Sequence, residues 1–162
     1  MPPLPNPLPF TVLILYAAPY MDWTFLPTDI IIKILLAGFL GLLLGAEREW
    51  SGKSAGIRTN MIIALGSCLF TILSIEGFPY SDTVDPSRIA AQIVTGVGFL
   101  GAGALIRTQD HIVGLTTAAN IWLVAAIGMA AGIGLPLVAI FITVITILTL
   151  IVLRPLKKTT MA

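Results

Sequence analysis

Five long apolar stretches constrain this chain more than any other feature of its sequence. Each is close to the roughly 20 residues that a helix needs to cross about 30 Å of hydrocarbon. They are Asp29–Ala46, Thr59–Ile75, Pro86–Ile106, Leu115–Gly132 and Leu135–Leu153. Only 10% of the 162 residues are charged, against about 25% in soluble domains. The sequence therefore predicts an all-α polytopic membrane protein with five transmembrane helices, in a domain that covers residues 28–154.

The two ends of the chain lie outside this predicted domain. Residues 1–27 start with a proline-rich segment, and the apolar run Phe10–Ala18 that follows is too short to span a bilayer. No Lys or Arg precedes that run, so it does not match a signal peptide. We interpret residues 1–27 as a disordered lead or, up to Met21, as a misassigned start. Residues 155–162 form a short tail.

The basic residues predict how the helices are oriented. Most of them fall on one side of the predicted spans, at Arg48, Lys53, Arg58, Arg107, Arg154, Lys157 and Lys158. Arg88 falls on the other side, and Lys33 lies one turn inside the first span, where it can snorkel to the surface. The positive-inside rule then places the N-terminus outside and the C-terminus in the cytoplasm. A net charge of +1 argues against a nucleic-acid partner, which needs a basic face.

An internal repeat relates the first two predicted helices to the next two. Gly38–Gly41 and Gly98–Gly101 both read Gly-Phe-Leu-Gly, and Gly56–Asn60 is echoed by Gly114–Thr117, with Asn120 one turn later. Two matches in the same order at nearly the same offset predict a parallel repeat about an axis along the membrane normal. The fifth helix falls outside the repeat and lacks glycine, which is typical of a peripheral helix.

The third stretch has marked ends and many glycines. Asp85 can cap its first free N–H groups, Pro86 suits the first helical position, and Arg107 ends the run. A glycine costs roughly 1 kcal/mol relative to alanine inside a helix, so the tract predicts close helix packing, with this helix at the centre of the bundle. The glycines expected at helix contacts are Gly41, Gly45, Gly98, Gly101, Gly103, Gly128 and Gly132.

A line of polar residues within the spans is the first candidate site. Polar side chains recur at helical spacing on one face of the second stretch, and the third and fourth stretches add more. We call the following set the polar seam: Asn60, Ser67, Thr71, Asp85, Arg88, Gln92, Thr95 and Asn120. Such residues either hold helices together by hydrogen bonds or line a path for a ligand or ion. Arg88 needs a carboxylate, carbonyl or headgroup partner, and Asp82 and Asp85 are near it in sequence.

A second candidate site lies where charges and helix starts gather at the cytoplasmic ends of both repeat units. We call this set the vestibule: Glu47, Arg48, Glu49, Arg58, Thr59, Arg107, Thr116 and Thr117. Free N–H groups at helix starts carry partial positive charge, and hydroxyl groups can cap them. The set is therefore either a polar binding site or a group of ordinary caps and solvated charges.

Several of these motifs together resemble the MgtC/SapB family of bacterial inner-membrane proteins, along residues 28–153. They are Gly45–Glu49, Ala55–Asn60, Asp85–Gln92, Gly98–Gly103 and Val113–Ala119. The resemblance implies a role in growth at low magnesium and in survival inside host cells. It also implies restraint of other membrane proteins, with the F-type ATP synthase among the candidates. Many relatives continue into a cytoplasmic ACT-like domain, whereas this sequence ends at Ala162, so regulation through that domain is not carried over.

Three functions remain open from the sequence. The first is a non-enzymatic regulator that binds helices of other membrane proteins, and the second is a transporter or channel for magnesium, another ion or a small solute. The third, an intramembrane enzyme, has little support, since His111 is the only histidine and no Gly-x-Ser-x-Gly motif is present. Cys68 is the only cysteine, and we expect no cofactor and assign no metal ligands. The expected partners are the lipid bilayer, other membrane proteins and further copies of the chain.

Overall fold

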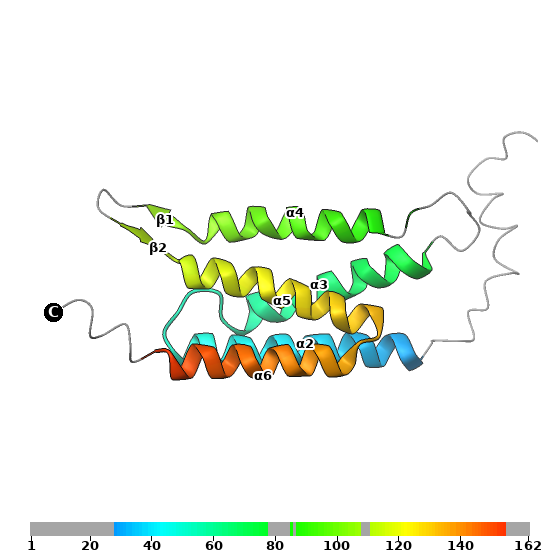
Figure 1. Ribbon diagram of the computed structural model, residues 1–162, viewed down its shortest axis with the longest axis horizontal. Helices are drawn as coiled ribbons and strands as arrows, with labels where there is room; N and C mark the ends of the chain where they lie inside the picture. Colours follow the sequence, from blue (N-terminus) through cyan, green and yellow to red (C-terminus); the bar gives the residue numbers. More distant parts are fainter. Residues whose placement is uncertain (1–27, 78–84, 86, 108–110, 155–162) are drawn as a thin grey trace, which may run out of the picture.

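The computed structural model is a bundle of five helices with one short hairpin, and it describes residues 28–77, 85, 87–107 and 111–154 (Figure 1). The helices are α2 (Thr28–Trp50), α3 (Ile57–Glu76), α4 (Ser87–Gly103), α5 (Leu115–Ile133) and α6 (Pro136–Val152). The predicted lead and tail, residues 1–27 and 155–162, lie outside the described residues.

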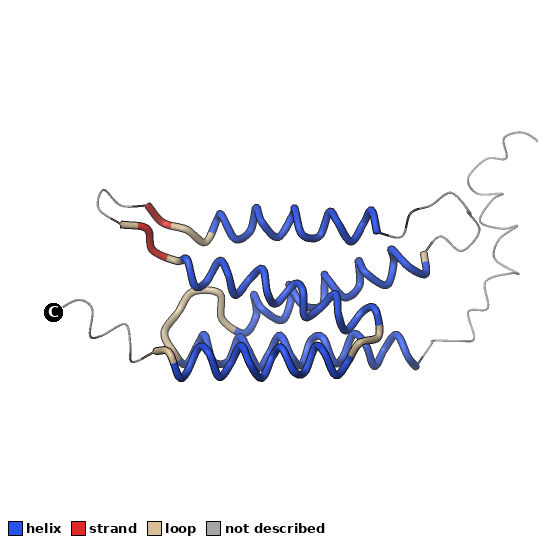
Figure 2. The backbone as a smooth tube through the Cα atoms, viewed as in Figure 1, coloured by secondary structure: helices blue, strands red, loops and turns tan. Residues whose placement is uncertain are grey.

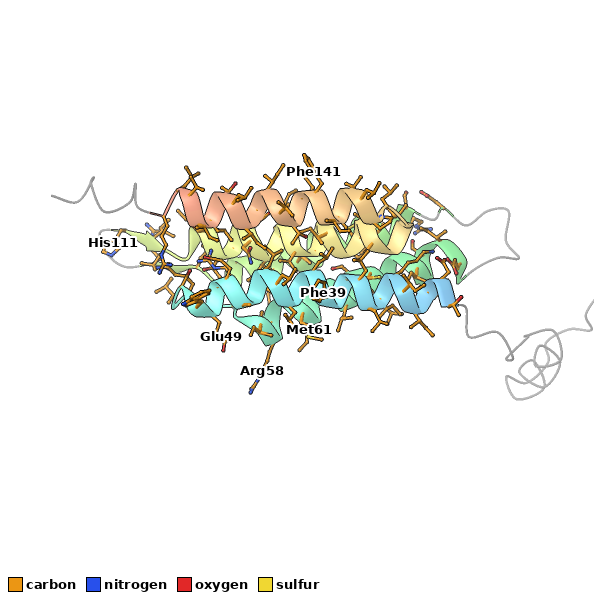
Figure 3. The ribbon with its side chains drawn as sticks, turned by 90° about the horizontal axis from the view of Figure 1, so that it is seen from below. Phe39, Glu49, Arg58, Met61, His111 and Phe141 are labelled. Carbon is orange, nitrogen blue, oxygen red and sulfur yellow. The ribbon has the colours of Figure 1, made fainter. Side chains whose placement is uncertain are left out.

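Three of these helices, α2, α3 and α5, are long and apolar enough to cross a membrane. The helix α6 is also apolar but has 17 residues, and α4 has the same length. Large apolar side chains cover much of the outer surface of the bundle, including Phe39 and Phe141, and Phe141 points away from it in Figure 3. An exterior of this kind suits a lipid environment and not water. The prediction of an all-α membrane protein with five helices is confirmed.

The predicted helix boundary at Arg107 is wrong. The helix α4 ends at Gly103, and Ile106–Arg107 forms strand β1, which pairs antiparallel with β2 (Ile112–Val113). These short strands hold β-branched residues, which favour extended backbone. Gly114 then adopts a left-handed conformation with φ of +98°, and it approaches Ala104 so closely that a side chain would clash. The apolar run continues past the end of the helix, so hydropathy alone did not reveal the hairpin.

The contacts between helices follow the predicted repeat. The helix α2 packs on α3 and α4 packs on α5, while α3 and α5 pack against each other in the middle. The diagonal contacts, α2 with α5 and α4 with α3, also correspond. Both α2 and α4 run in one direction, and both α3 and α5 run in the other (Figure 1). The pairing therefore agrees with a parallel repeat, and α6 lies outside it, alongside α2 and α5 (Figure 2).

The expected central position of the third helix is wrong. In one chain α4 lies at the edge of the bundle and packs mainly on α5 and α3 (Figure 1). Its buried residues are Ile93, Val97 and Gly101. The centre is formed by α3 and α5, which contribute fully buried side chains such as Cys68 on α3 and Val124 on α5. A glycine tract indicates that close approach is sterically allowed, but it does not specify that a neighbouring helix is present.

Candidate functional site

A pair of asparagines joins the two halves of the repeat. The Nδ2 of Asn120 on α5 donates a hydrogen bond of 2.7 Å to the Oδ1 of Asn60 on α3, and both residues are buried. The Nδ2 of Asn60 also donates to the carbonyl oxygens of Ala55 and Gly56, the latter at 2.9 Å. These bonds tie the loop before α3 to the centre of the bundle. The two residues are 60 positions apart, which is the offset of the repeated Gly-Phe-Leu-Gly motif.

Beyond the asparagine pair, toward the C-terminal ends of α3 and α5, glycines on α5 bring the two helices into direct contact. A side chain at Gly128 would clash with the carbonyl oxygen of Ala64, and a Cβ at Gly132 would lie 2.8 Å from that of Cys68. The hydroxyl of Thr71, on the same face of α3, donates to the carbonyl oxygen of Ser67 at 2.8 Å. The polar residues on this face are therefore buried in a tightly packed contact.

The residues of the polar seam on α4 do not join this contact. Arg88, Gln92 and Thr95 are exposed on α4, whereas Asn60 and Asn120 are buried between α3 and α5. The Thr95 hydroxyl contacts its own helix, 3.4 Å from the carbonyl oxygen of Ala91. The expectation of one continuous seam is therefore not met, because α4 lies at the edge of the bundle, although Ser67 on α3 and Gln92 on α4 line the same groove.

Asp85 caps the start of α4, as its position in the sequence predicts. Its Oδ1 accepts hydrogen bonds from the Ser87 backbone N–H at 2.8 Å and from the Ser87 hydroxyl at 2.7 Å. These bonds to the charged form hold the pKa of Asp85 below its usual value. Asp82 lies outside the described residues, so its expected pairing with Arg88 stays a prediction.

The vestibule residues divide into a buried part and a solvent-facing part. Arg48 is only 4% exposed, its Nε lies 3.5 Å from the Oε2 of Glu47, and the Ser51 hydroxyl donates to the Oε1 of Glu47 at 2.6 Å. The Glu49 Oε2 accepts from the backbone N–H of Ile57 at 3.1 Å and so caps α3. The exposed members are Glu49, Arg58, Thr59, Arg107 and Thr116. Arg58 points away from the bundle in Figure 3, so these residues do not converge on one site.

The buried part retains unused hydrogen-bonding capacity. Within the described ranges, Glu47 Oε2, Arg48 Nε and Nη1, and Asn120 Oδ1 have no hydrogen-bond partner. Such atoms are available to ordered water or to a polar ligand. The burial of Arg48 was not predicted, although the sequence holds a signal for it. Arg48 follows Gly41 and Gly45 at helical spacing, and both glycines face α3.

The Thr117 hydroxyl belongs to the buried part of the vestibule. It lies 3.5 Å from the Ser54 hydroxyl, so the loop between α2 and α3 reaches the start of α5. This contact and the asparagine pair together hold the two repeat units at the same end of the bundle.

At the opposite end, Lys33 joins two helices. Its Nζ lies 2.8 Å from the Oδ2 of Asp29 and 3.5 Å from the Oε1 of Glu76. The lysine therefore links the start of α2 to the end of α3. This arrangement fits the structural role expected from a snorkelling lysine.

The sequence did not reveal a groove between α3 and α4. It has a volume of about 530 Å³ and is lined almost entirely by apolar atoms. Gly66, Ser67 and Phe70 contribute to one wall, and Gln92 and Gly96 contribute to the other. The groove arises because α4 is held mainly by α5 and leaves part of α3 uncovered.

The described residues do not match the side-chain groupings that bind metal ions. No three His, Cys, Asp or Glu side chains there gather closely enough to hold a metal ion. The buried Arg48 and the partly buried Glu47, at the end of α2, neutralise each other. Nothing in this arrangement resembles the set of oxygen ligands that Mg²⁺ favours.

The fold and these buried polar contacts define a helical membrane protein with an internal parallel repeat. The MgtC family model matches residues 34–159, so the chain belongs to the MgtC family. The chain is 47% identical over 135 residues to YhiD of Escherichia coli K12, whose name describes it as a candidate magnesium transporter. It is 44% identical over 124 residues to Protein MgtC of Salmonella typhimurium LT2 and 43% identical over 120 residues to Protein SapB of Bacillus subtilis.

These matches cover the membrane domain. They include 79%, 76% and 70% of this chain, but only 62%, 52% and 51% of YhiD, MgtC and SapB. The chain thus spans between half and two thirds of the length of these curated relatives. No solved structure matches the fold significantly.

Proposed function

We propose that this chain is a non-enzymatic regulator of other membrane proteins that serves growth at low magnesium and survival inside host cells. The observation that carries the proposal is the packing between α3 and α5. The polar side chains there bond to each other and to the backbone, and Gly128 and Gly132 bring the helices into contact. A closed contact of this kind suits a rigid scaffold better than a path for ions.

The partner we propose is another integral membrane protein, with the F-type ATP synthase as the first candidate. The outer faces of α2 and α6 support this proposal, since they offer large apolar side chains to neighbours in the membrane, including Phe39 and Phe141. Association between membrane helices depends on packing and interhelical hydrogen bonds. Such surfaces suit binding by shape, without a catalytic group.

Two measurements on the same protein test the proposal. The chain should restore growth at low magnesium in a bacterium that lacks its own family members. Added to inverted membrane vesicles, it should also lower ATP-driven proton pumping. The test variant is Asn60→Leu. It removes the hydrogen bonds to the loop and to Asn120 and should lose both effects. Restored growth with unchanged pumping would reject the ATP synthase but would keep the regulator.

A transporter is the second candidate, favoured by one specific observation. The buried Arg48 and the partly buried Glu47 have unfilled hydrogen-bonding capacity near the end of the bundle, and YhiD has a name that refers to magnesium transport. Purified chain in liposomes that hold a magnesium-sensitive dye separates the two functions. A regulator should leave the flux at the level of empty liposomes. A flux that disappears in Glu47→Gln would replace the regulator with a transporter.

We further propose that the protein lies in the bacterial inner membrane with its N-terminus outside and its C-terminus in the cytoplasm. The hairpin, the start of α3 and the end of α6 lie at one end of the bundle (Figure 1), and that end holds Arg48, Arg58, Arg107 and Arg154. This grouping supports the orientation that the positive-inside rule predicts. Lys53→Cys in a Cys68→Ala background should react with a membrane-impermeant thiol reagent only after the cells are opened. Labelling in intact cells would reverse the orientation.

A further inference from the structure

We propose that the groove between α3 and α4 binds one phospholipid with an anionic headgroup. Its phosphate would bind Arg88, and one acyl chain would lie along the groove. This site is separate from the asparagine pair and from the buried part of the vestibule. The proposal does not depend on whether the chain is a regulator or a transporter.

The walls of the groove leave space for a flexible apolar chain. A Cβ at Gly66 on α3 or at Gly96 on α4 would meet no atom of the described residues within 4 Å. Phe70 and Ile93 supply apolar surface beside these glycines. An apolar groove that faces hydrocarbon disfavours water, so the acyl chain of a neighbouring lipid is the natural occupant.

The residues along α4 match the chemistry of a phospholipid in order of depth. Arg88, Gln92 and Gly96 are each four residues apart, so they follow one face of the helix in steps of about 6 Å. Arg88 lies near the helix start, where a phosphate group is expected, and Gln92 lies one turn deeper, where its amide can donate to an ester carbonyl. Gly96 then lies at the level of the acyl chain.

The charge of Arg88 favours an anionic ligand. Its side chain is exposed, and within the described residues its guanidinium has no ion pair or side-chain hydrogen bond. The nearby Asp85 accepts its bonds from Ser87, and the charge of Arg88 acts on it without forming an ion pair. Arginine binds phosphate through a planar fork of donors, and basic sites between membrane helices are suited to lipid headgroups.

The repeat explains why this groove is open. Its counterpart in the first half, between α2 and α5, is covered by α6, whose buried residues include Ala139, Thr143 and Thr146. The groove between α3 and α4 has no covering helix among the described residues. A second helix like α6 would present small, uncharged residues and would leave Arg88 without a partner. A lipid instead fills the groove with an acyl chain and pairs its phosphate with Arg88.

The test compares two lipids and a matched pair of variants by native mass spectrometry of the full chain in detergent. The probes are phosphatidylglycerol and zwitterionic phosphatidylcholine with the same acyl chains. Gly96→Leu fills the groove, whereas Gly98→Leu adds the same side chain two residues away, where the glycine also has free space but does not line the groove. Arg88→Gln removes the charge and keeps a polar side chain.

The proposal predicts that wild-type protein retains phosphatidylglycerol in preference to phosphatidylcholine. Arg88→Gln should reduce that preference about fivefold, the factor for roughly 1 kcal/mol per basic residue near anionic lipid. Gly96→Leu should weaken binding of both lipids about tenfold, as expected for the loss of two buried methylene groups. Gly98→Leu should bind as the wild type does. If Gly96→Leu fails to fold, Gly66→Leu fills the groove from the other wall.

Three results would overturn the proposal. One is equal lipid binding by Gly96→Leu and Gly98→Leu, with Gly66→Leu also unchanged. Another is a wild-type dimer that Gly96→Leu dissociates and Gly98→Leu does not, because the groove would then hold a second copy of the chain. The third is a preference for phosphatidylglycerol that persists in Arg88→Gln, because the headgroup would then not be held by Arg88.

Discussion

The two halves of the repeat share a motif but differ in how tightly they pack. In the first half, Gly41 faces α3 so closely that a Cβ would lie 2.8 Å from the carbonyl oxygen of Asn60. In the second half, a Cβ at the equivalent Gly101 would lie 3.6 Å from that of Ala118, an ordinary contact distance. A repeated motif therefore preserves which helices pair, while the closeness of each pair depends on its neighbours.

The same difference extends to the other glycines that the packing set has on α2 and α4. Gly45 lies against the start of α3, where a Cβ would be 2.5 Å from the Cα of Ile57. Gly98 and Gly103 on α4 face space that is free of described atoms within 4 Å. The expectation that these two glycines pack against a helix of the same chain is therefore not met. The first half is a closed helix pair, and the second half has an open face.

The largest expected effect comes from adding one methyl group to each half. Gly41→Ala should lower the stability of the detergent-solubilised protein by up to about 3 kcal/mol, because overpacking against a backbone oxygen is hard to relieve. Gly101→Ala should leave the melting temperature unchanged or raise it slightly, since alanine is the better helix former. Equal losses in the two variants would show that both halves are packed to the same degree.

The second prediction concerns the asparagine pair that joins the halves. Asn60 makes three hydrogen bonds, two of them to the loop before α3, whereas its partner Asn120 donates one to Asn60. Asn60→Ala should therefore cost about 2 kcal/mol, and Asn120→Ala about 1 kcal/mol. Thermal unfolding of both single variants and the double variant measures the coupling. Strict additivity would mean that the bond between the asparagines contributes nothing.

The helix class, the number of helices and the repeat could be predicted because hydropathy and repeated motifs depend only on local sequence. Residues such as Asp85, whose role as a cap is set by its neighbours, were also identified correctly. The edge position of α4 could not be predicted, because glycines permit contact on either side. The burial of Arg48 and the groove beside Gly96 depend on how several helices meet, and no single stretch encodes that arrangement.

A third, smaller effect concerns the ion pairs of Lys33, which support only the first half. Lys33→Met keeps the apolar stem but removes the links to Asp29 and Glu76. It should cost about 0.5 kcal/mol at low salt, since partly exposed ion pairs are weak. The loss should shrink as salt is raised. Asp29→Asn, which removes only the pair within α2, is the control. A larger loss in Asp29→Asn than in Lys33→Met would contradict a role in joining α2 to α3.

The smallest effect is local and concerns the start of α4, in the open half. Because the glycines of α4 make few tight contacts, we expect its first turn to depend on the Asp85 cap more than on packing. The Ser87 bonds lower the pKa of Asp85, so the cap is fully present above the unfolded pKa of about 3.9 and is lost as the pH falls through the lower folded value. Hydrogen exchange at Arg88 and Ile89, corrected for intrinsic rates, should therefore rise in acid.

Asp85→Ala should show the same rise at neutral pH with an unchanged melting temperature. Asp85→Asn, which keeps an acceptor, should show a smaller rise that does not depend on pH. Exchange in Asp85→Ala equal to that of the wild type at neutral pH would mean that packing, and not the cap, holds the first turn.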